Sequence, residues 1–198
     1  MSSRQMRQYD SSESAAFRST KGYLGGLSNM APGFPLNING MRILTSEALY
    51  QACRFPNHPD VQRLVIAQTS PMTSKMKAKS HASDSRQDWL SVRVAVMRWC
   101  LRVKLAQNWE RFGDLLLSTG NVPIVEDSAK DPFWGARATD VGTFEGVNAL
   151  GRLLMELREG LRDSPGSLQL VLPPKVSNFC LLGTPIGTIE REPSGSST

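Results

Sequence analysis

The stretch Ile43-Leu44-Thr45-Ser46-Glu47-Ala48-Leu49-Tyr50-Gln51-Ala52-Cys53-Arg54-Phe55 places one carboxylate at the start of a predicted helix. Thr45 or Ser46 can cap that helix, because a hydroxyl oxygen accepts a hydrogen bond from a free backbone N–H. Proline at position 56 ends it soon after Phe55, since the residue before a proline avoids the helical conformation. Glu47 then lies in the first turn, where the helix dipole favours negative charge by about 0.3–1 kcal/mol. We therefore predict an ionised carboxylate available for chemistry, with a simple dipole partner as the alternative.

The residues on either side of this helix predict a small hairpin before it and a helical core after it. Asn39-Gly40 within residues 34–43 is a strong signal for a two-residue hairpin turn. An apolar stripe at helical spacing over residues 88–108 predicts the central core helix. Further helices are expected at residues 61–68, 72–79, 109–117 and 148–162, with Gly120 as a left-handed cap and a short strand at 121–125.

Composition sets the broad class of the protein. The chain has 198 residues, 40% of them hydrophobic, which fits one domain with a real core. The net charge of +5 is compatible with a polyanionic partner. Three widely spaced cysteines indicate reduced core residues, and two histidines without partners at ligand spacing imply no metal and no cofactor. No apolar stretch has the length of a membrane span or a signal peptide, so we expect a cytoplasmic protein.

The chain divides into three parts. Residues 1–16 are polar and rich in serine, so we expect a disordered arm. Residues 17–162 form the folded domain, in which residues 136–147 are expected to form a loop. Residues 163–198 form a C-terminal extension with short strands at 168–172 and 176–182 and a disordered end from Arg191.

Two loops carry residue types suited to binding and catalysis. Residues 17–29 combine Arg18 and Lys21 with a double glycine, which suits close approach to a phosphate, although an ordinary glycine turn is the alternative. Residues 126–135 hold Asp131, which can donate a proton or orient a water, and Trp134, which can stack on a flat ring. The alternative for this loop is that Asp-Pro simply forms a turn.

Other residues allow both a structural and a functional interpretation. Trp89, at the start of the central helix, is either a core side chain or a base-stacking ring. Lys75, Lys77 and Lys79 form either a solvated helix face or a contact to a nucleic-acid backbone. Gly151 lies inside the last helix, capped by Asn148, at a cost of about 1 kcal/mol relative to alanine. A ligand or a neighbouring backbone should therefore require the absent side chain.

The order of motifs resembles the NADAR family, also called YbiA-like, over residues 17–162. The resemblance implies an α+β fold that is mostly α-helical with a small β component, and cleavage of N-glycosidic bonds to ribose. The motifs are GGLSN, TSEALYQACRF, DW followed by VMRWCLRVKLAQN, LLLSTG, DPFWG and NALGRLLMELRE.

The resemblance also implies roles for particular residues. Glu47 would be the principal catalytic carboxylate, Asp131 a second catalytic or ribose-binding group, and Trp89 and Trp134 the aromatic walls. The division of acid and base roles between the two carboxylates stays open. Arg18, Lys21 or Lys104 would hold a diphosphate, and the remaining residues expected to line the site are Ser28, Asn29, Gln51, Gly135, Asn148 and Gly151.

Three functions follow from the resemblance. The segments at residues 17–36 and 45–62 are similar to hydrolases that remove ADP-ribose from guanine in DNA or RNA, as antitoxins or repair enzymes beside a toxin ADP-ribosyltransferase. The second function is an N-glycosidase on riboflavin-pathway ribosylamino-pyrimidine phosphates. Members of that type tend to carry an SEH motif, and Ala48 stands at its histidine position. The third is a non-catalytic module that binds ADP-ribose or NAD. None of the three implies a membrane partner.

Overall fold

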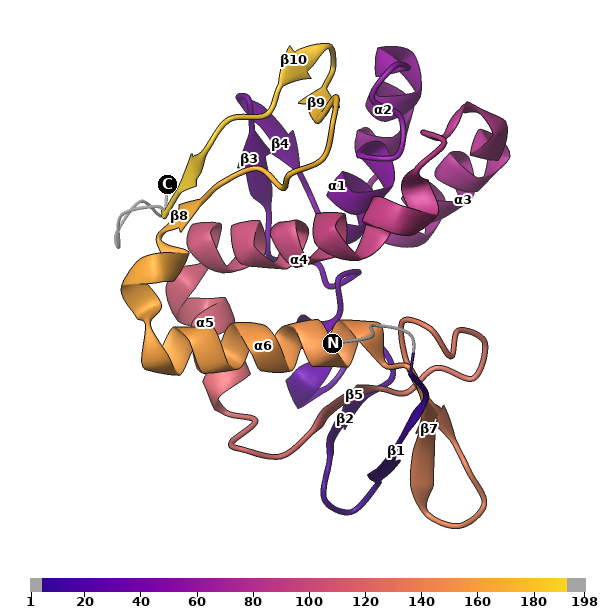
Figure 1. Cartoon of the computed structure of the whole chain (residues 1–198), viewed down its shortest axis with the longest axis vertical. Helices are drawn as coiled ribbons and strands as arrows, with labels where there is room; N and C mark the ends of the chain where they lie inside the picture. Colours follow the sequence, from indigo (N-terminus) through magenta and orange to yellow (C-terminus); the bar gives the residue numbers. More distant parts are fainter. Residues whose placement is uncertain (1–4, 192–198) are drawn as a thin grey trace. The chain divides into compact units, whose positions relative to one another are not determined.

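A computed structural model describes residues 5–191, which fall into two compact units (Figure 1). The first unit comprises Met1–Ser28 and Arg111–Ser164, and the second comprises Asn29–Glu110 and Pro165–Thr198. Helices and small sheets mix along the chain, which confirms the predicted α+β class.

The second unit begins with the predicted hairpin and the Glu47 helix. Strands β3 (Leu36–Ile38) and β4 (Met41–Ile43) pair antiparallel, and both turn residues have positive φ, 51° at Asn39 and 77° at Gly40. Helix α1 (Ser46–Ala52) follows directly. The Thr45 hydroxyl oxygen accepts a hydrogen bond from the Ala48 N–H at 3.2 Å, which confirms the predicted cap.

Helix α4 is the longest helix of the second unit, and its apolar stripe is buried as predicted. It spans Trp89–Gln107, and Val96, Trp99 and Val103 are inaccessible or nearly so. Helix α1 packs against α2 (Pro59–Ile66), α3 (Pro71–Ser80) and α4 (Figure 1). A short 3₁₀ turn at Ala82–Asp84 precedes α4. Helix α5 (Trp109–Leu117) follows α4, and its residues from Arg111 onward belong to the first unit.

The C-terminal extension contributes two short antiparallel pairs to the second unit. Strand β8 (Leu170–Val171) pairs with β11 (Ile189–Glu190), and β9 (Cys180–Leu181) pairs with β10 (Thr184–Pro185). The predicted strands are therefore present but shorter. A 3₁₀ turn at Pro165–Leu168 precedes β8. The N–H of Arg191 donates to the Gln169 carbonyl at 2.8 Å, so the expected disorder does not begin at this residue. Residues 192–198 lie outside the described part.

The first unit contains two sheets and the last helix. Strands β1 (Arg7–Asp10), β7 (Thr143–Gly146) and β6 (Arg137–Ala138) form one sheet, with β7 in the middle. Strand β2 (Ala15–Phe17) pairs parallel with β5 (Ile124–Glu126). A 3₁₀ helix spans Tyr23–Leu27, and α6 spans Ala149–Asp163.

Two sequence expectations for the first unit were wrong. The arm at residues 1–16 is not disordered in its described part, and residues 136–147 are not a loop, because both contain strands. Tyr9 on β1 is buried in a cluster with Val125, Ala136 and Phe144. Each strand is too short and too polar to show a periodic pattern, and only the pairing of β1 with β7 creates the shared apolar face.

Gly151 is required by the backbone of β5. A Cβ atom at this position would lie 2.1 Å from the carbonyl oxygen of Ile124, far closer than a methyl group tolerates. The side chain of Asn148 also contacts β5. Its amide nitrogen donates to the Ile124 carbonyl at 2.8 Å, and its amide oxygen accepts from the Glu126 N–H at 3.2 Å. Asn148 occupies the predicted N-cap position of α6, but its side chain does not cap the helix, because the amide group pairs with β5.

The close packing of α6 on β5 predicts that Gly151→Ala is destabilising. Alanine is the better helix former, yet the clash with the Ile124 carbonyl should lower the free energy of unfolding by about 1–3 kcal/mol or more. Urea denaturation measures the change. Gly166→Ala is the matched control, because nothing lies within 4 Å of the added carbon there. Equal stability of the two variants would contradict the packing.

Candidate active site

Glu47 is a buried acid in the first turn of α1, with 3% of its surface exposed. Its N–H donates to the carbonyl of Asn29 at 2.9 Å, which ties the start of the helix to the preceding segment. The side chain of Asn29 also donates through Nδ2 to Oε2 of Glu47. Asn29 therefore fixes both the backbone and the carboxylate of this acid.

The other oxygen of Glu47 is held by its own helix. Nε2 of Gln51 donates to Oε1 of Glu47 at 2.8 Å, across one helical turn. Two amide groups thus bind the two oxygens of one carboxylate, which fixes its orientation without neutralising its charge. Asn29 and Gln51, both predicted to line the site, are brought together with Glu47.

Arg54 fixes the Gln51 amide and was missed by the sequence analysis. Its Nη1 donates to Oε1 of Gln51 at 3.0 Å, and its Nη2 donates to the hydroxyl of Ser85 at 3.1 Å. An amide oxygen that faces a guanidinium leaves its NH₂ group to face the carboxylate. The spacing of positions 47, 51 and 54, which places three polar side chains on one helical face, is the signal that could have identified Arg54.

An aromatic pair stands beside this polar chain. The rings of Tyr50 and Trp89 have centroids 4.9 Å apart and planes inclined by 47°. The guanidinium carbon of Arg54 lies 5.5 Å from the Trp89 ring centroid. Trp89 is half-buried at the start of α4, so part of its surface remains accessible. Burial, and then the charge of Glu47, raise the pKa of Tyr50, which therefore stays a neutral phenol.

The sign of the electrostatic effect on Glu47 is opposite to the one expected from the helix dipole. Burial raises the pKa of Glu47 above its ordinary value of 4.5. The hydrogen bond from Gln51, the charge of Lys75 on α3 and the hydrogen bond from Asn29 oppose this rise without cancelling it. Loss of water outweighs a dipole effect of about 0.3–1 kcal/mol. The carboxyl group is thus favoured to hold a proton at a higher pH than a free glutamate.

The predicted residue Lys104 lies in the same unit but is not exposed. It is 1% accessible, and its Nζ lies 4.3 Å from the ring centroid of Phe34. A cation in that position can favour an incoming anion only by charge or after a local movement. Its contact with a diphosphate stays a prediction.

The remaining predicted residues belong to the first unit. Oδ1 of Asp131 accepts the N–H groups of Phe133 and Trp134 at 3.1 and 3.0 Å, so this acid closes the Asp-Pro turn. Trp134 is half-buried and packs edge-on against Phe133. The roles of Asp131 and Trp134 toward a substrate stay predictions. The same holds for the other residues expected to line the site, of which Arg18 and Lys21 are exposed and Ser28, Gly135, Asn148 and Gly151 are buried.

The part of the chain that the structure describes contains neither a group of potential metal ligands nor a membrane-spanning helix. Within residues 5–191, no three His, Cys, Asp or Glu side chains are grouped so that they could hold a metal ion. Over the same residues, every helix is too short or too polar to cross a membrane.

Comparison with known proteins matches the sequence of this chain to a family. The model of the NADAR domain matches residues 16–162, which include Glu47 and every predicted site residue. The N-glycosidase YbiA of Escherichia coli strain K12 is 36% identical over 148 residues, which cover 73% of this chain and 86% of that protein. The NMR structure of the Escherichia coli protein YbiA has a TM-score of 0.64 and 33% identity, over 75% of this chain and 84% of that one.

Two further relatives, one of them named for riboflavin biosynthesis, also match. The riboflavin biosynthesis protein VVA0006 of Vibrio vulnificus is 34% identical over 139 residues, which cover 70% of this chain and 36% of that longer protein. The N-glycosidase Npun_R5314 of Nostoc punctiforme is 30% identical over 141 residues, or 70% of this chain and 86% of that protein.

The raised pKa of Glu47 predicts a pH-dependent effect of Glu47→Gln on stability. Above pH 4.5 the folded wild-type protein binds more protons at this position than the unfolded chain, so its free energy of unfolding falls as pH rises through the folded pKa. The variant lacks this loss. Urea denaturation from pH 4 to 9 should therefore show the variant gaining stability relative to wild type as pH rises. Glu13→Gln controls for the loss of one exposed charge, and a pH-independent difference would contradict the prediction.

The charge of Lys75 predicts a second measurable shift. Lys75→Met removes a cation that lowers the pKa of Glu47, so the pKa should rise further. Titration of the Glu47 carboxyl carbon by ¹³C NMR measures it. Lys77→Met, on the same helix, is the control, since Lys77 is not among the groups that act on Glu47. An unchanged Glu47 titration in Lys75→Met would show that the charge is screened.

Proposed function

The chain belongs to the NADAR family, and from this premise we propose that it hydrolyses the N-glycosidic bond between ADP-ribose and a guanine base of nucleic acid. The coarser activity, hydrolysis of an N-glycosyl bond, follows from relatives named N-glycosidases. The observation that carries the proposal is the buried Glu47 carboxyl, whose two oxygens are held by Asn29 and Gln51. A toxin ADP-ribosyltransferase would supply such a substrate, which gives the protein an antitoxin or repair role.

A fixed, buried carboxylate suits the cleavage of a ribosyl bond. As the C1″–N bond breaks, positive charge develops on the ribose and passes through an oxocarbenium-like state. A carboxylate already oriented by Asn29 and Gln51 stabilises that charge without reorganising. Water then adds to C1″ and loses a proton, and the departing guanine nitrogen gains one. The products are free ADP-ribose and unmodified guanine.

The raised pKa of Glu47 supports its participation in these proton transfers. A carboxyl group that keeps its proton at a higher pH can give it to the leaving nitrogen. The carboxylate that results then faces the cationic ribose and can accept the proton of the attacking water. One group can therefore serve both steps, and Asp131 is a further candidate for the second.

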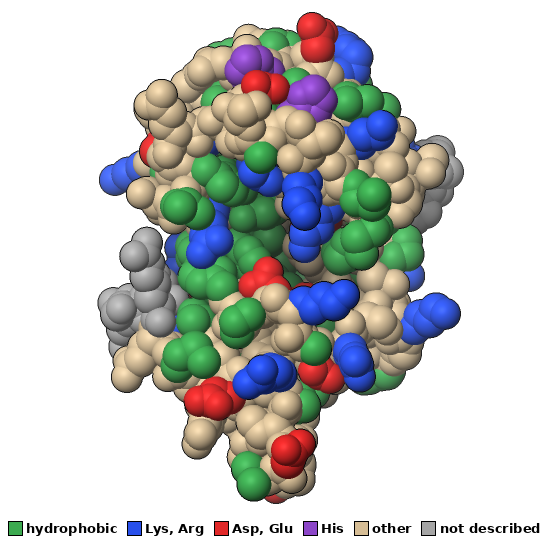
Figure 2. All heavy atoms as spheres, turned by 90° about the vertical axis from the view of Figure 1, so that its right-hand side faces the viewer, with side chains coloured by type: hydrophobic (Ala, Val, Ile, Leu, Met, Phe, Trp, Pro, Cys, Tyr) green, Lys and Arg blue, Asp and Glu red, His purple; other side chains and the backbone are tan. Residues whose placement is uncertain are grey.

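The basic surface supports a polyanionic substrate. Lys75, Lys77 and Lys79 are exposed on α3, a helix without acidic residues that packs on α1. Figure 2 shows Lys and Arg side chains at the visible surface, with apolar side chains and several Asp or Glu side chains among them. Such cations can bind backbone phosphates, and the half-buried Trp89 offers a ring on which a base can stack.

A second candidate substrate is a ribosylamino-pyrimidine phosphate of the riboflavin pathway. The match to proteins named for riboflavin biosynthesis favours it. The same carboxylate chemistry would apply, because that bond also joins a ribose carbon to nitrogen. Ala48, buried directly after Glu47, supplies no imidazole at the position of the SEH histidine, which supports the nucleic-acid substrate instead.

The test is release of ADP-ribose from an oligonucleotide that carries ADP-ribosylated guanine, followed by mass spectrometry, beside a thymine-modified control. We expect release from guanine alone, and a loss of at least about 100-fold in kcat for Glu47→Gln with little change in substrate binding. Glu13→Gln is the matched control and should retain full activity.

Other outcomes would redirect the proposal. Turnover of a ribosylamino-pyrimidine phosphate, without release from the oligonucleotide, would establish the second substrate. Tight binding of ADP-ribose without hydrolysis of any linkage would make the protein a non-catalytic reader. Full activity of Glu47→Gln would remove Glu47 from the mechanism.

A further inference from the structure

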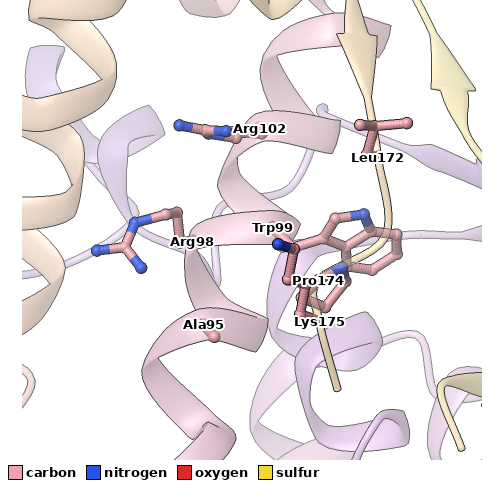
Figure 3. Close-up of a pocket in the computed structure, with 7 residues that line it drawn as sticks. All are labelled: Ala95, Arg98, Trp99, Arg102, Leu172, Pro174 and Lys175. Carbon is pink, nitrogen blue, oxygen red and sulfur yellow. The ribbon is translucent and has the colours of Figure 1, made fainter. Parts of the chain in front are cut away.

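The second unit contains a pocket that none of the predicted site residues lines. Its volume is about 210 Å³, and it lies between α4 and the segment that follows β8 (Figure 3). The lining residues are Ala95, Arg98, Trp99, Arg102, Leu172, Pro174 and Lys175. The last three follow residue 162, where the match to the family ends, so the C-terminal extension forms one wall.

The indole N–H of Trp99 is a buried donor that lacks an acceptor within the described chain. Trp99 is 2% exposed, and its Nε1 has no hydrogen-bond partner there. Its ring is fixed edge-on against Phe179, with centroids 4.9 Å apart, so it cannot easily turn toward another acceptor. In Figure 3 the nitrogen of the Trp99 indole lies on the side of the indole toward Leu172, among the residues that line the pocket. A buried donor left unpaired is unfavourable, and an oxygen atom in the pocket would satisfy it.

The charged residues around the pocket indicate which kind of ligand would supply this oxygen atom. Arg98, Arg102 and Lys175 line it, and no acid does. Arg98 and Arg102, one helical turn apart on α4, also make other interactions, whereas Lys175 is exposed on the extension. A pocket with positive charge on two walls and a neutral N–H donor favours an anion with several acceptor oxygens.

We propose that this pocket binds a phosphate group, one oxygen of which accepts the Trp99 indole N–H while Lys175 and the α4 arginines balance its charge. The volume is below the 300–1,000 Å³ of typical small-molecule sites, so it suits a single phosphate rather than a whole dinucleotide. The phosphate can belong to a polynucleotide backbone or to a free small molecule. The site is independent of the proposed hydrolysis, because Glu47 does not line it.

The experiment follows the tryptophan indole resonances in ¹H–¹⁵N NMR spectra of the whole chain, with Trp99→Phe used to assign the Trp99 signal. The separate probes are inorganic phosphate, AMP and an unmodified single-stranded oligonucleotide, with sodium chloride at matched ionic strength as the control. We expect the Trp99 signal to shift downfield on saturation. Lys175→Ala should weaken the binding about tenfold, and Arg63→Ala, which removes an exposed cation on α2, should not.

The probes distinguish the sources of the phosphate. A Trp99 shift with all three identifies a general phosphate site, and a shift with the oligonucleotide alone identifies a backbone contact; either supports the proposal. An unmoved Trp99 signal with every probe would overturn it, as would an equal shift in chloride or an unchanged affinity in Lys175→Ala. Because none of the probes carries ADP-ribosylated guanine, a failure of the proposed hydrolase activity leaves this result unaffected.

Discussion

The burial of the Glu47 carboxyl is the constraint on which the site depends. A carboxylate removed from water must be hydrogen-bonded, and the chain supplies Asn29 from the segment before the hairpin and Gln51 from the same helix. Arg54 then orients Gln51, and Ser85 orients Arg54. Each contact fixes the next, so Ser85, which is distant from Glu47 in the sequence, helps to hold the acid in place. Such a fixed arrangement is what stabilisation of a short-lived cation requires.

The same burial also changes the pKa of the Glu47 carboxyl group. Desolvation raises the pKa of Glu47, while two amides and the charge of Lys75 limit the rise. The carboxyl group therefore releases its proton at a higher pH than a free glutamate does. Tyr50, kept neutral by its own burial, adds a ring beside this group without adding a charge.

Two residues of the last motif are required by the structure rather than by a ligand. Asn148 and Gly151 lie three positions apart, and both contact the backbone of β5, Asn148 through hydrogen bonds and Gly151 through the absence of a side chain. Trp99, by contrast, lies in the middle of the core helix and has an N–H group that the core does not satisfy. The extension that covers it is the part of the chain beyond the family match.

The amino-acid sequence by itself determined the features that depend on neighbouring residues: the Asn39-Gly40 turn, a hydroxyl cap at Thr45 or Ser46, the helices to within about two residues, and the family motifs around Glu47. These signals are local, because a cap or a turn is complete within a few residues. The tertiary structure alone decided the pairing of β1 with β7, the link from Arg54 to Glu47 and the partner of Asn148. It also decided the direction of the Glu47 pKa shift, because the helix dipole can be inferred from position in the chain, whereas the loss of water depends on every element that packs around the carboxyl group.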